Sequence, residues 1–321
     1  MAAFAHITIP KRTVALLFDF SSSIRGVHDL GEGITLKETV HVAIQQAMDA
    51  FLSGLRRKTG ESFITYLSPH ERDEFDAALF CLEHQFEAPD EVDEAEKRSK
   101  AEIVKVLIAM RAVKSTLAKP GLYLGWEKRG TEWELRGFEK VGFDVYHAPG
   151  ELEEPLLLES FSATDVASVA EIMPRVRRAY VAHGRDRFNR VANALNFFET
   201  GYRSNFPPVR FVVFTTALES LFITSDESIS RQFRERISRF LARDSAGCQQ
   251  LEDTCREIYD ARSAIIHGQP VPGGGARMNR LTLDVQGIGR HCLRRVLADD
   301  ALFDRFCGPA SDLERLLEQV L

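Results

Sequence analysis

The sequence predicts an α+β protein that is mainly helical, with a mixed α/β N-terminal domain at residues 1–161 and an all-α helical bundle at residues 162–321. The first half alternates short apolar runs with amphipathic stretches, which is typical of a domain that combines strands and helices. From about Ser162 onward, apolar residues recur at helical spacing and only short loops separate the segments. This change of pattern sets the predicted domain boundary.

The N-terminal domain is predicted to contain both strands and helices. Short apolar runs predict strands, at His6 to Ile9, Val14 to Phe20 and Pro155 to Phe161. Apolar residues at helical spacing predict helices, at Leu36 to Leu55, Glu71 to Phe86 and Ala95 to Leu117. Two further runs flank the polar stretch KRGTE and predict a hairpin, formed by Leu122 to Trp126 and Trp133 to Phe138.

The C-terminal domain is predicted to be a series of helices. Ser162 or Thr164 can cap the first one, which runs toward Ala182 and which Pro174 should kink or divide. The later helices follow the apolar spacing, at Phe188 to Tyr202, Val209 to Phe222, Ser228 or Ser230 to Leu241, Cys248 to His267, Leu281 to Leu297 and Leu313 to Leu321. Val209 to Phe222 is almost wholly apolar, so this helix is predicted to lie in the middle of the bundle.

Composition excludes several classes of function. The net charge of −6 argues against electrostatic binding of nucleic acid by the protein surface as a whole. The arginines of the second half leave two interpretations open, a local basic surface or solvated helix faces. No histidine spacing or CxxC pair indicates a metal site, and no glycine-rich phosphate loop indicates a nucleotide cofactor. We therefore expect neither metal nor cofactor.

The five cysteines and the hydropathy of the chain bear on its location. An odd number of cysteines without paired spacing indicates reduced thiols, as in the cytoplasm. No stretch approaches the roughly 18–20 apolar residues of a membrane span, and the N-terminus carries no signal-peptide pattern. The sequence thus predicts a cytoplasmic protein that does not associate with a membrane.

The segment from Leu251 to Gly268 holds the strongest candidate for chemistry. Arg262 and His267 form an R-x4-H pattern at the end of a predicted helix, which Gly268 stops. Arginine binds phosphate and histidine transfers protons near neutral pH, so the pair suits a phosphodiester substrate. The pattern alone has low specificity, because Arg178 and His183 also fit it.

The spacing of the pair constrains how it could act. Five residues along an α-helix rotate the side chain by roughly 140°, so Arg262 and His267 do not share one helix face. Two copies of the helix across a twofold axis could supply both groups to one cleft, which predicts a homodimer. In the alternative interpretation, His267 caps the helix by bonding terminal carbonyls and Arg262 pairs with Glu219 or Asp260.

The segment resembles HEPN domains, the higher-eukaryote and prokaryote nucleotide-binding helical bundles. It is most similar to the Apea-like HEPN group of bacterial defence systems. The matching stretches are FVVFTTALESLF, at Phe211 to Phe222, and YDARSAIIHG, at Tyr259 to Gly268. The resemblance is closest over about Arg210 to Gly268 and extends from about Arg178 to the C-terminus. Arg111 to Gly121 loosely resembles N-terminal regions that accompany this group.

The resemblance implies a metal-independent endoribonuclease, a toxin or antiphage effector, that acts as a homodimer through the bundle. Arg262 and His267 would be catalytic and leave a 2′,3′-cyclic phosphate. The supporting residues would be Glu219, Tyr259, Asp260 and Ser263. The sequence itself leaves Arg178 and His183 as either structural residues or auxiliary RNA contacts, and the candidate RNA contacts are Arg178, Arg185 and Arg187. The N-terminal domain would bind a regulatory trigger. Some HEPN domains are inactive, which gives the alternative of a non-catalytic dimerisation module or one that binds a nucleotide or a partner.

Overall fold

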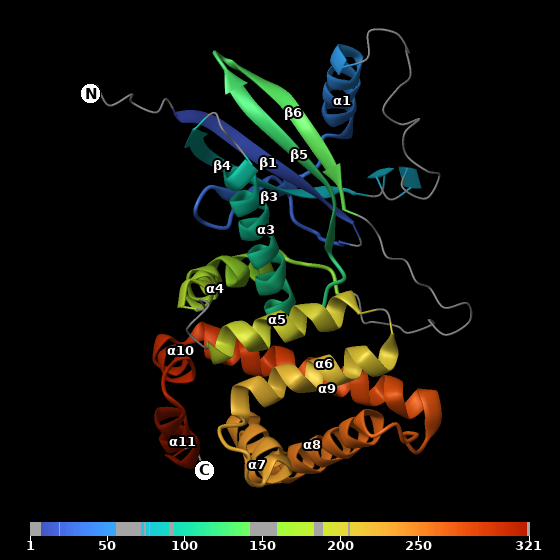
Figure 1. Cartoon of the computed structure of the whole chain (residues 1–321), viewed down its shortest axis with the longest axis vertical. Coiled ribbons are helices and arrows are strands. Elements are labelled where there is room, and N and C mark those ends of the chain that lie inside the picture. The colour runs from blue at the N-terminus through green and yellow to red at the C-terminus, as the bar shows by residue number, and fades with distance from the viewer. Residues whose placement is uncertain are drawn as a thin grey trace. The chain divides into compact units, whose positions relative to one another are not determined.

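The computed structural model describes residues 8–18, 20–55, 72–73, 75–76, 78–89, 93–141, 159–182, 189–204 and 206–319. The described residues form two compact units (Figure 1). The sheet unit is taken from Met1–Met110, Thr116–Asp144 and Leu158–Ala170, and the helical unit from Arg111–Ser115, Val145–Leu157 and Glu171–Leu321. The predicted fold class is confirmed, with an antiparallel sheet and helices first and an all-helical region after them.

Six strands form the antiparallel sheet of the first unit, in the order β2-β3-β4-β1-β5-β6. Their bounds are β1 Thr8–Phe18, β2 Val27–Asp29, β3 Ile34–Glu38, β4 Phe80–Pro89, β5 Lys119–Arg129 and β6 Glu132–Lys140. β1 lies in the interior of the sheet, between β4 and β5. The predicted hairpin is confirmed as β5 and β6, which turn at Gly130 and Thr131.

Two helices cover opposite faces of this sheet. α1 (His41–Leu55) packs Ile44 and Met48 against Val14, Leu16 and neighbouring apolar residues of the core. α3 (Asp93–Val113) lies across the other face, where Ser99 hydrogen-bonds His84 and Lys100 lies over the ring of Tyr123. Alternate residues of a strand point to opposite faces, so Cys81 and Glu83 face α1 whereas Leu82 and His84 face α3. α3 is the predicted helix at Ala95 to Leu117, which is confirmed with a somewhat earlier end.

Three predictions for the N-terminal domain are wrong. Glu71 to Phe86 is not a single helix, because Phe80–Pro89 forms β4 between β1 and β3. The predicted helix at Leu36 to Leu55 begins only at His41, since Ile34–Glu38 forms β3. β1 continues through Pro10 where a break was expected. Pro10 is tolerated because it pairs only with β4, and the ladder with β5 starts at Lys11.

The predicted strand at Pro155 to Phe161 lies largely outside the described residues. Phe161 itself forms an isolated bridge with Ser22, and Ser22 Oγ donates a hydrogen bond to the Phe161 carbonyl at 2.8 Å. After Phe161, Ser162 and Asp165 form reciprocal hydrogen bonds that open α4. The predicted cap at Ser162 is thereby confirmed.

The second unit is formed by helices whose predicted positions are mostly confirmed. Their bounds are α4 Ala163–Ala182, α5 Arg190–Arg203, α6 Pro207–Phe222, α7 Ile229–Leu241, α8 Ser245–Ile266, α9 Gly274–Ala298, α10 Asp300–Cys307 and α11 Ala310–Gln319. The first residues of α4 belong to the sheet unit. α4 runs undivided through Pro174, where a kink or a division was predicted, and α10 was not predicted.

The central place predicted for the apolar helix is confirmed for α6. Phe211, Phe214 and Phe222 are fully buried, and α6 contacts α5, α7, α8 and α9. Close packing depends on small residues opposite it. A Cβ at Gly201 of α5 would lie 2.5 Å from the Phe214 ring, so this contact requires glycine. Among the described residues, no helix is both long and apolar enough to cross a membrane.

Candidate active site

The end of α8 has the geometry that the glycine at 268 predicts. Gly268 adopts a left-handed backbone with φ of 68°. Its N–H donates to the Ile265 carbonyl at 3.0 Å, and the Gln269 N–H donates to the Ala264 carbonyl at 2.8 Å. These two bonds form a Schellman motif, which satisfies carbonyls that the helix itself leaves without partners. The motif ends α8 sharply and fixes the position of His267.

His267 is the C-cap residue of α8, and its side chain is exposed. Its backbone N–H donates to the Ser263 carbonyl at 3.1 Å, whereas its ring makes no hydrogen bond with any described residue. The predicted C-cap position is confirmed, but the ring is not used to bind the terminal carbonyls. The imidazole is therefore accessible to a substrate.

Arg262 lies one turn earlier, on a different side of α8. Its Nη2 donates to Glu219 Oε2 of α6 at 3.2 Å, and the two side chains are 27% and 15% exposed. The predicted Arg262–Glu219 pair is confirmed, and no described contact joins Arg262 to Asp260. The Nε of Arg262 is buried without a hydrogen-bond partner among the described residues. The guanidinium thus keeps donor capacity beyond its ion pair.

The surroundings of this pair affect the charge of Glu219. Burial raises the pKa of Glu219 above its ordinary value, and the charge and hydrogen bond of Arg262 only partly offset that effect. Burial also raises the pKa of Tyr259, and the neighbouring Glu219 raises it further. Tyr259, Glu219 and Arg262 therefore form one interacting group at the contact of α6 with α8.

The remaining supporting residues are spread around the helix. Tyr259 stacks on Phe233 of α7 with ring centroids 5.6 Å apart. Ser263 is half-buried beside Arg262, and Asp260 is exposed. The structure brings Glu219, Tyr259 and Arg262 together, and it leaves Asp260 outside that group.

Of the three candidate RNA contacts, only Arg178 lies among the described residues. Arg178 donates to Asp300 at 3.0 Å and Asp304 at 2.6 Å of α10, and its guanidinium lies 4.9 Å from the Phe303 ring centroid. These contacts give Arg178 a role in holding α10 against α4. Arg185 and Arg187, like His183 of the second R-x4-H match, lie outside the described residues.

The arginines of α7 are largely engaged with acidic or backbone partners. Arg231 donates to Glu235 at 2.7 Å, and Arg234 lies 3.5 Å from Glu252. Arg236 donates to the Phe222 carbonyl at the end of α6 at 2.7 Å. Of the two interpretations left open by the sequence, this arrangement favours paired helix faces over a basic surface.

One role that Arg190 and Arg236 share was not predicted from the sequence. Arg190 donates to the carbonyls of Ser220 and Ile223 at 3.0 Å and 2.6 Å, so both arginines bind oxygens at the end of α6. Positive charge is favourable at a helix C-terminus. The absence of glycine or another cap after Phe222 is the signal in the sequence that could have pointed to them.

The described residues form neither a disulfide nor a cluster of metal-ligand side chains. All five cysteines are free thiols, and no three His, Cys, Asp or Glu side chains of the described part gather as metal ligands.

Comparisons with models of known protein families, with curated proteins and with solved structures find no match to this chain. The HEPN resemblance therefore stays a prediction from the motif residues.

Proposed function

We propose that this chain is a metal-independent endoribonuclease that cleaves RNA with Arg262 and His267 at the interface of a homodimer. The observation that carries the proposal is the exposed imidazole of His267, held by a rigid helix stop one turn beyond the half-buried Arg262. An accessible histidine and a phosphate-binding cation on one rigid element are the two groups that RNA cleavage by proton transfer requires.

The chemistry uses the RNA's own ribose as nucleophile. His267 would accept the proton of the 2′-hydroxyl or give one to the leaving 5′-oxygen. Arg262 would hold the scissile phosphate and offset the charge that grows on its oxygens. The 2′-oxygen then forms a bond to phosphorus while the bond to the 5′-oxygen breaks. The products are a 2′,3′-cyclic phosphate and a 5′-hydroxyl.

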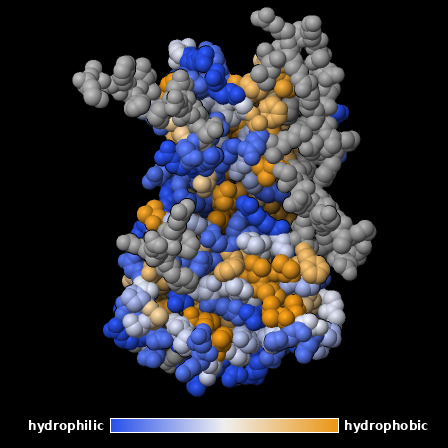
Figure 2. Space-filling view, in the orientation of Figure 1, coloured by the Kyte–Doolittle hydropathy of each residue, from blue (hydrophilic) through white to orange (hydrophobic). Residues whose placement is uncertain are grey.

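A homodimer follows from the positions of the two groups on α8. The roughly 140° between them keeps one chain from aiming both at one phosphate, so a second copy must complete the site. Exposed apolar residues support a surface for that copy. Phe206 and Val209 at the start of α6 are 59% and 46% exposed, and Ile266 at the end of α8 is 53% exposed. Figure 2 shows hydrophobic side chains over α6 on the visible face.

The activity would make the chain a cytoplasmic toxin or antiphage effector, with its sheet unit restraining the nuclease until a trigger binds. A non-catalytic HEPN module is the second candidate, and one observation favours it. The ion pair with Glu219 gives Arg262 a structural role that needs no substrate. In that case the bundle would only dimerise or bind a nucleotide or a partner.

The test is cleavage of labelled RNA by the purified full chain in EDTA, with the cyclic phosphate end identified. His267→Ala should lower the rate by at least about a hundredfold, because general acid–base catalysis contributes roughly 10²–10⁴. Arg262→Ala should lower it similarly. His291→Ala and Arg256→Ala are the matched controls, since both side chains are exposed and lie on α9 and α8.

Equal cleavage by His267→Ala and His291→Ala would refute the assignment, as would a strict need for a divalent ion. The non-catalytic module predicts a wild type that dimerises but cleaves no RNA with or without the trigger, and an unchanged dimer in Arg262→Ala. Melting curves of all four variants check that they fold.

A further inference from the structure

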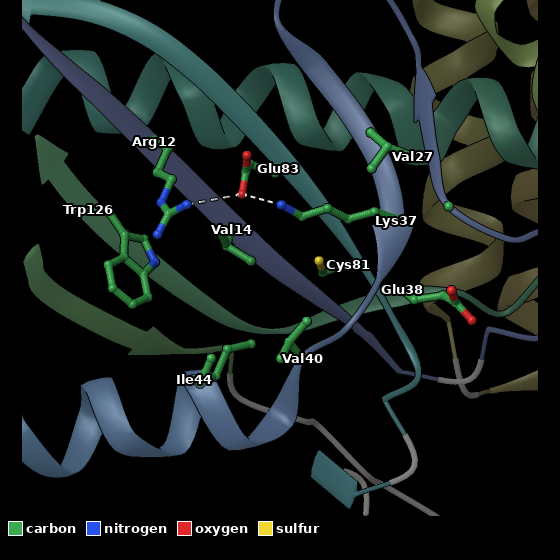
Figure 3. A pocket seen from close by; sticks show the side chains of 12 residues that line it. Arg12, Val14, Val27, Lys37, Glu38, Val40, Ile44, Cys81, Glu83 and Trp126 are labelled. Carbon is green, nitrogen blue, oxygen red and sulfur yellow. Dashed lines mark hydrogen bonds and ion pairs between the residues drawn. The ribbon is translucent and has the colours of Figure 1, made fainter. Parts of the chain in front are cut away.

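The sheet unit holds a cavity on the face that α1 covers. Its volume is about 480 Å³, and its walls come from strands β1 to β5, the start of α1 and the loops that precede β2 and α1 (Figure 3). Apolar side chains form most of its lining, including Val14, Val27, Val40 and Ile44. Val27 and Val40 are 67% and 65% exposed, so they mark the open side of the cavity. Cavities of roughly 300–1,000 Å³ with an apolar lining are typical of small-molecule sites.

One cation is fixed at the wall of this cavity by two aromatic rings. The guanidinium carbon of Arg12 lies 4.5 Å from the ring centroid of Trp126 and 4.6 Å from that of Trp133. These rings come from β5, which lies beside β1 in the sheet, and from β6, the next strand. Stacking holds the planar group without using its N–H donors. The guanidinium of Arg12 is thus held in position, and the two rings leave its N–H groups available as hydrogen-bond donors.

The polar atoms nearby confirm that hydrogen-bond donors, and not acceptors, are in surplus. Glu83 accepts from Lys37 at 2.6 Å and from Gln85 at 2.7 Å, one bond to each carboxylate oxygen. The distance from Arg12 Nη1 to Glu83 Oε2 is 3.7 Å, which is too long for a hydrogen bond. Arg12 Nε and Trp126 Nε1 are buried without hydrogen-bond partners among the described residues. Buried donors of this kind call for an acceptor.

The charges around the cavity sum to a positive value. Arg12 and Lys37 are two cations against the single buried carboxylate Glu83. The other acidic side chain of the lining, Glu38, is paired with Arg25 at 2.6 Å and points away from Glu83 in Figure 3. Burial raises the pKa of Cys81 to about 11, so its thiol adds no negative charge near neutral pH.

We propose that this cavity binds a small organic monoanion with an apolar body, whose acidic group meets Arg12 and whose body lies against Val14, Ile44 and Trp126. Benzene is held by cavities of about 150 Å³, so this one takes a body of about two to three rings or an alkyl chain of comparable volume. The acidic group supplies the acceptors that Arg12 lacks. This site stands independently of the proposed ribonuclease activity.

The test uses anilinonaphthalene sulfonate, an aromatic monoanion whose fluorescence rises in apolar surroundings, with the full chain. The dye should bind with one-to-one stoichiometry. Arg12→Met keeps an unbranched apolar stem but removes the guanidinium and its charge, and it should weaken binding about tenfold or more, as expected for a charge-assisted hydrogen bond. Arg98→Met is its control, because Arg98 is exposed on α3, at the opposite face of the sheet.

A second variant tests the cavity without changing a charge. Ala43 lines the cavity from the surface of α1, so Ala43→Trp should fill it and weaken dye binding about tenfold or more. Ala50→Trp, about two helical turns later and outside the lining, should bind the dye as the wild type does. Circular dichroism melts show whether each variant folds.

Competition then identifies the role of the acidic group. Decanoate should displace the dye at least about tenfold better than decanol, which has the same chain without the charge. Equal displacement by the two would overturn the anion assignment. Dye binding unchanged in both Arg12→Met and Ala43→Trp would overturn the site itself.

Discussion

Substituting the buried carboxylate Glu199 by glutamine should destabilise the helical unit more than the loss of an ordinary ion pair would. Glu199 of α5 accepts hydrogen bonds from Arg111 and from Arg203, the latter at 2.7 Å. Arg111 is only 4% exposed and lies 5.0 Å from the Tyr202 ring centroid, whereas Arg203 is 57% exposed. Glu199→Gln therefore removes the charge that Glu199 supplies to the buried guanidinium of Arg111.

The expected loss is about 3–5 kcal/mol of unfolding free energy, as for other buried pairs broken on one side. Arg203→Gln removes a partner that water can replace, so it should cost only about 0–1 kcal/mol. Replacing both buried partners, by Arg111→Met with Glu199→Leu, should recover most of the loss because neither charge of this pair then remains buried. Urea unfolding followed by circular dichroism measures all three.

The pH dependence of this pair has a defined sign. Burial by itself raises the pKa of Glu199, but the charges and hydrogen bonds of Arg111 and Arg203 outweigh it and hold the pKa below its ordinary 4.5. The stabilisation is therefore present above pH 4.5 and is lost as the pH falls through the lowered pKa. The difference in unfolding free energy between wild type and Glu199→Gln should therefore shrink as the solution is acidified. The reasoning would be refuted if Glu199→Gln lost no more unfolding free energy than Arg203→Gln. It would also be refuted if the difference between wild type and Glu199→Gln persisted in acid.

Two further predictions concern the candidate active site. Burial raises the pKa of Glu219, so its charged form is disfavoured in the folded state and stability should fall as the pH rises from 4.5 through that raised pKa. Glu219→Gln should therefore leave the unfolding free energy at pH 7 no lower than that of the wild type, and a clear loss in urea unfolding would contradict this. Gly268→Ala places a side chain at φ of 68° and should cost about 1–2 kcal/mol. Gly287→Ala, in the interior of α9 with no atom near the new methyl, should instead stabilise by about 0.5–1 kcal/mol, and calorimetry that ranks the two alike would contradict the backbone argument.

The sequence predicted the helical unit well because its signals are local. The apolar spacing of α6 and the glycine after His267 act within a few residues, and both led to the observed geometry. The pairing of Arg262 with Glu219 was one of two options at the sequence level. Only the packing of α6 against α8 selected it, because sequence spacing does not determine which helices touch.

The sheet unit was predicted less well, since strand formation depends on distant partners. Phe80–Pro89 carries Leu, Glu and Gln, residues compatible with a helix, yet β1 and β3 supply hydrogen bonds on both of its edges. Neither partner is adjacent in sequence. The position of Arg12 between two tryptophans likewise required three strands to align.

What the sequence determined by itself is the class of most local segments in the bundle, the sharp stop of α8 and the C-cap position of His267. These follow from backbone propensities and from hydrogen bonds over one helical turn. The tertiary structure decided the antiparallel strand order, the partner of Arg262 and the cavity beside Arg12. Each of these arises from residues far apart along the chain, whose contacts are fixed by burial of a shared core and not by any local preference.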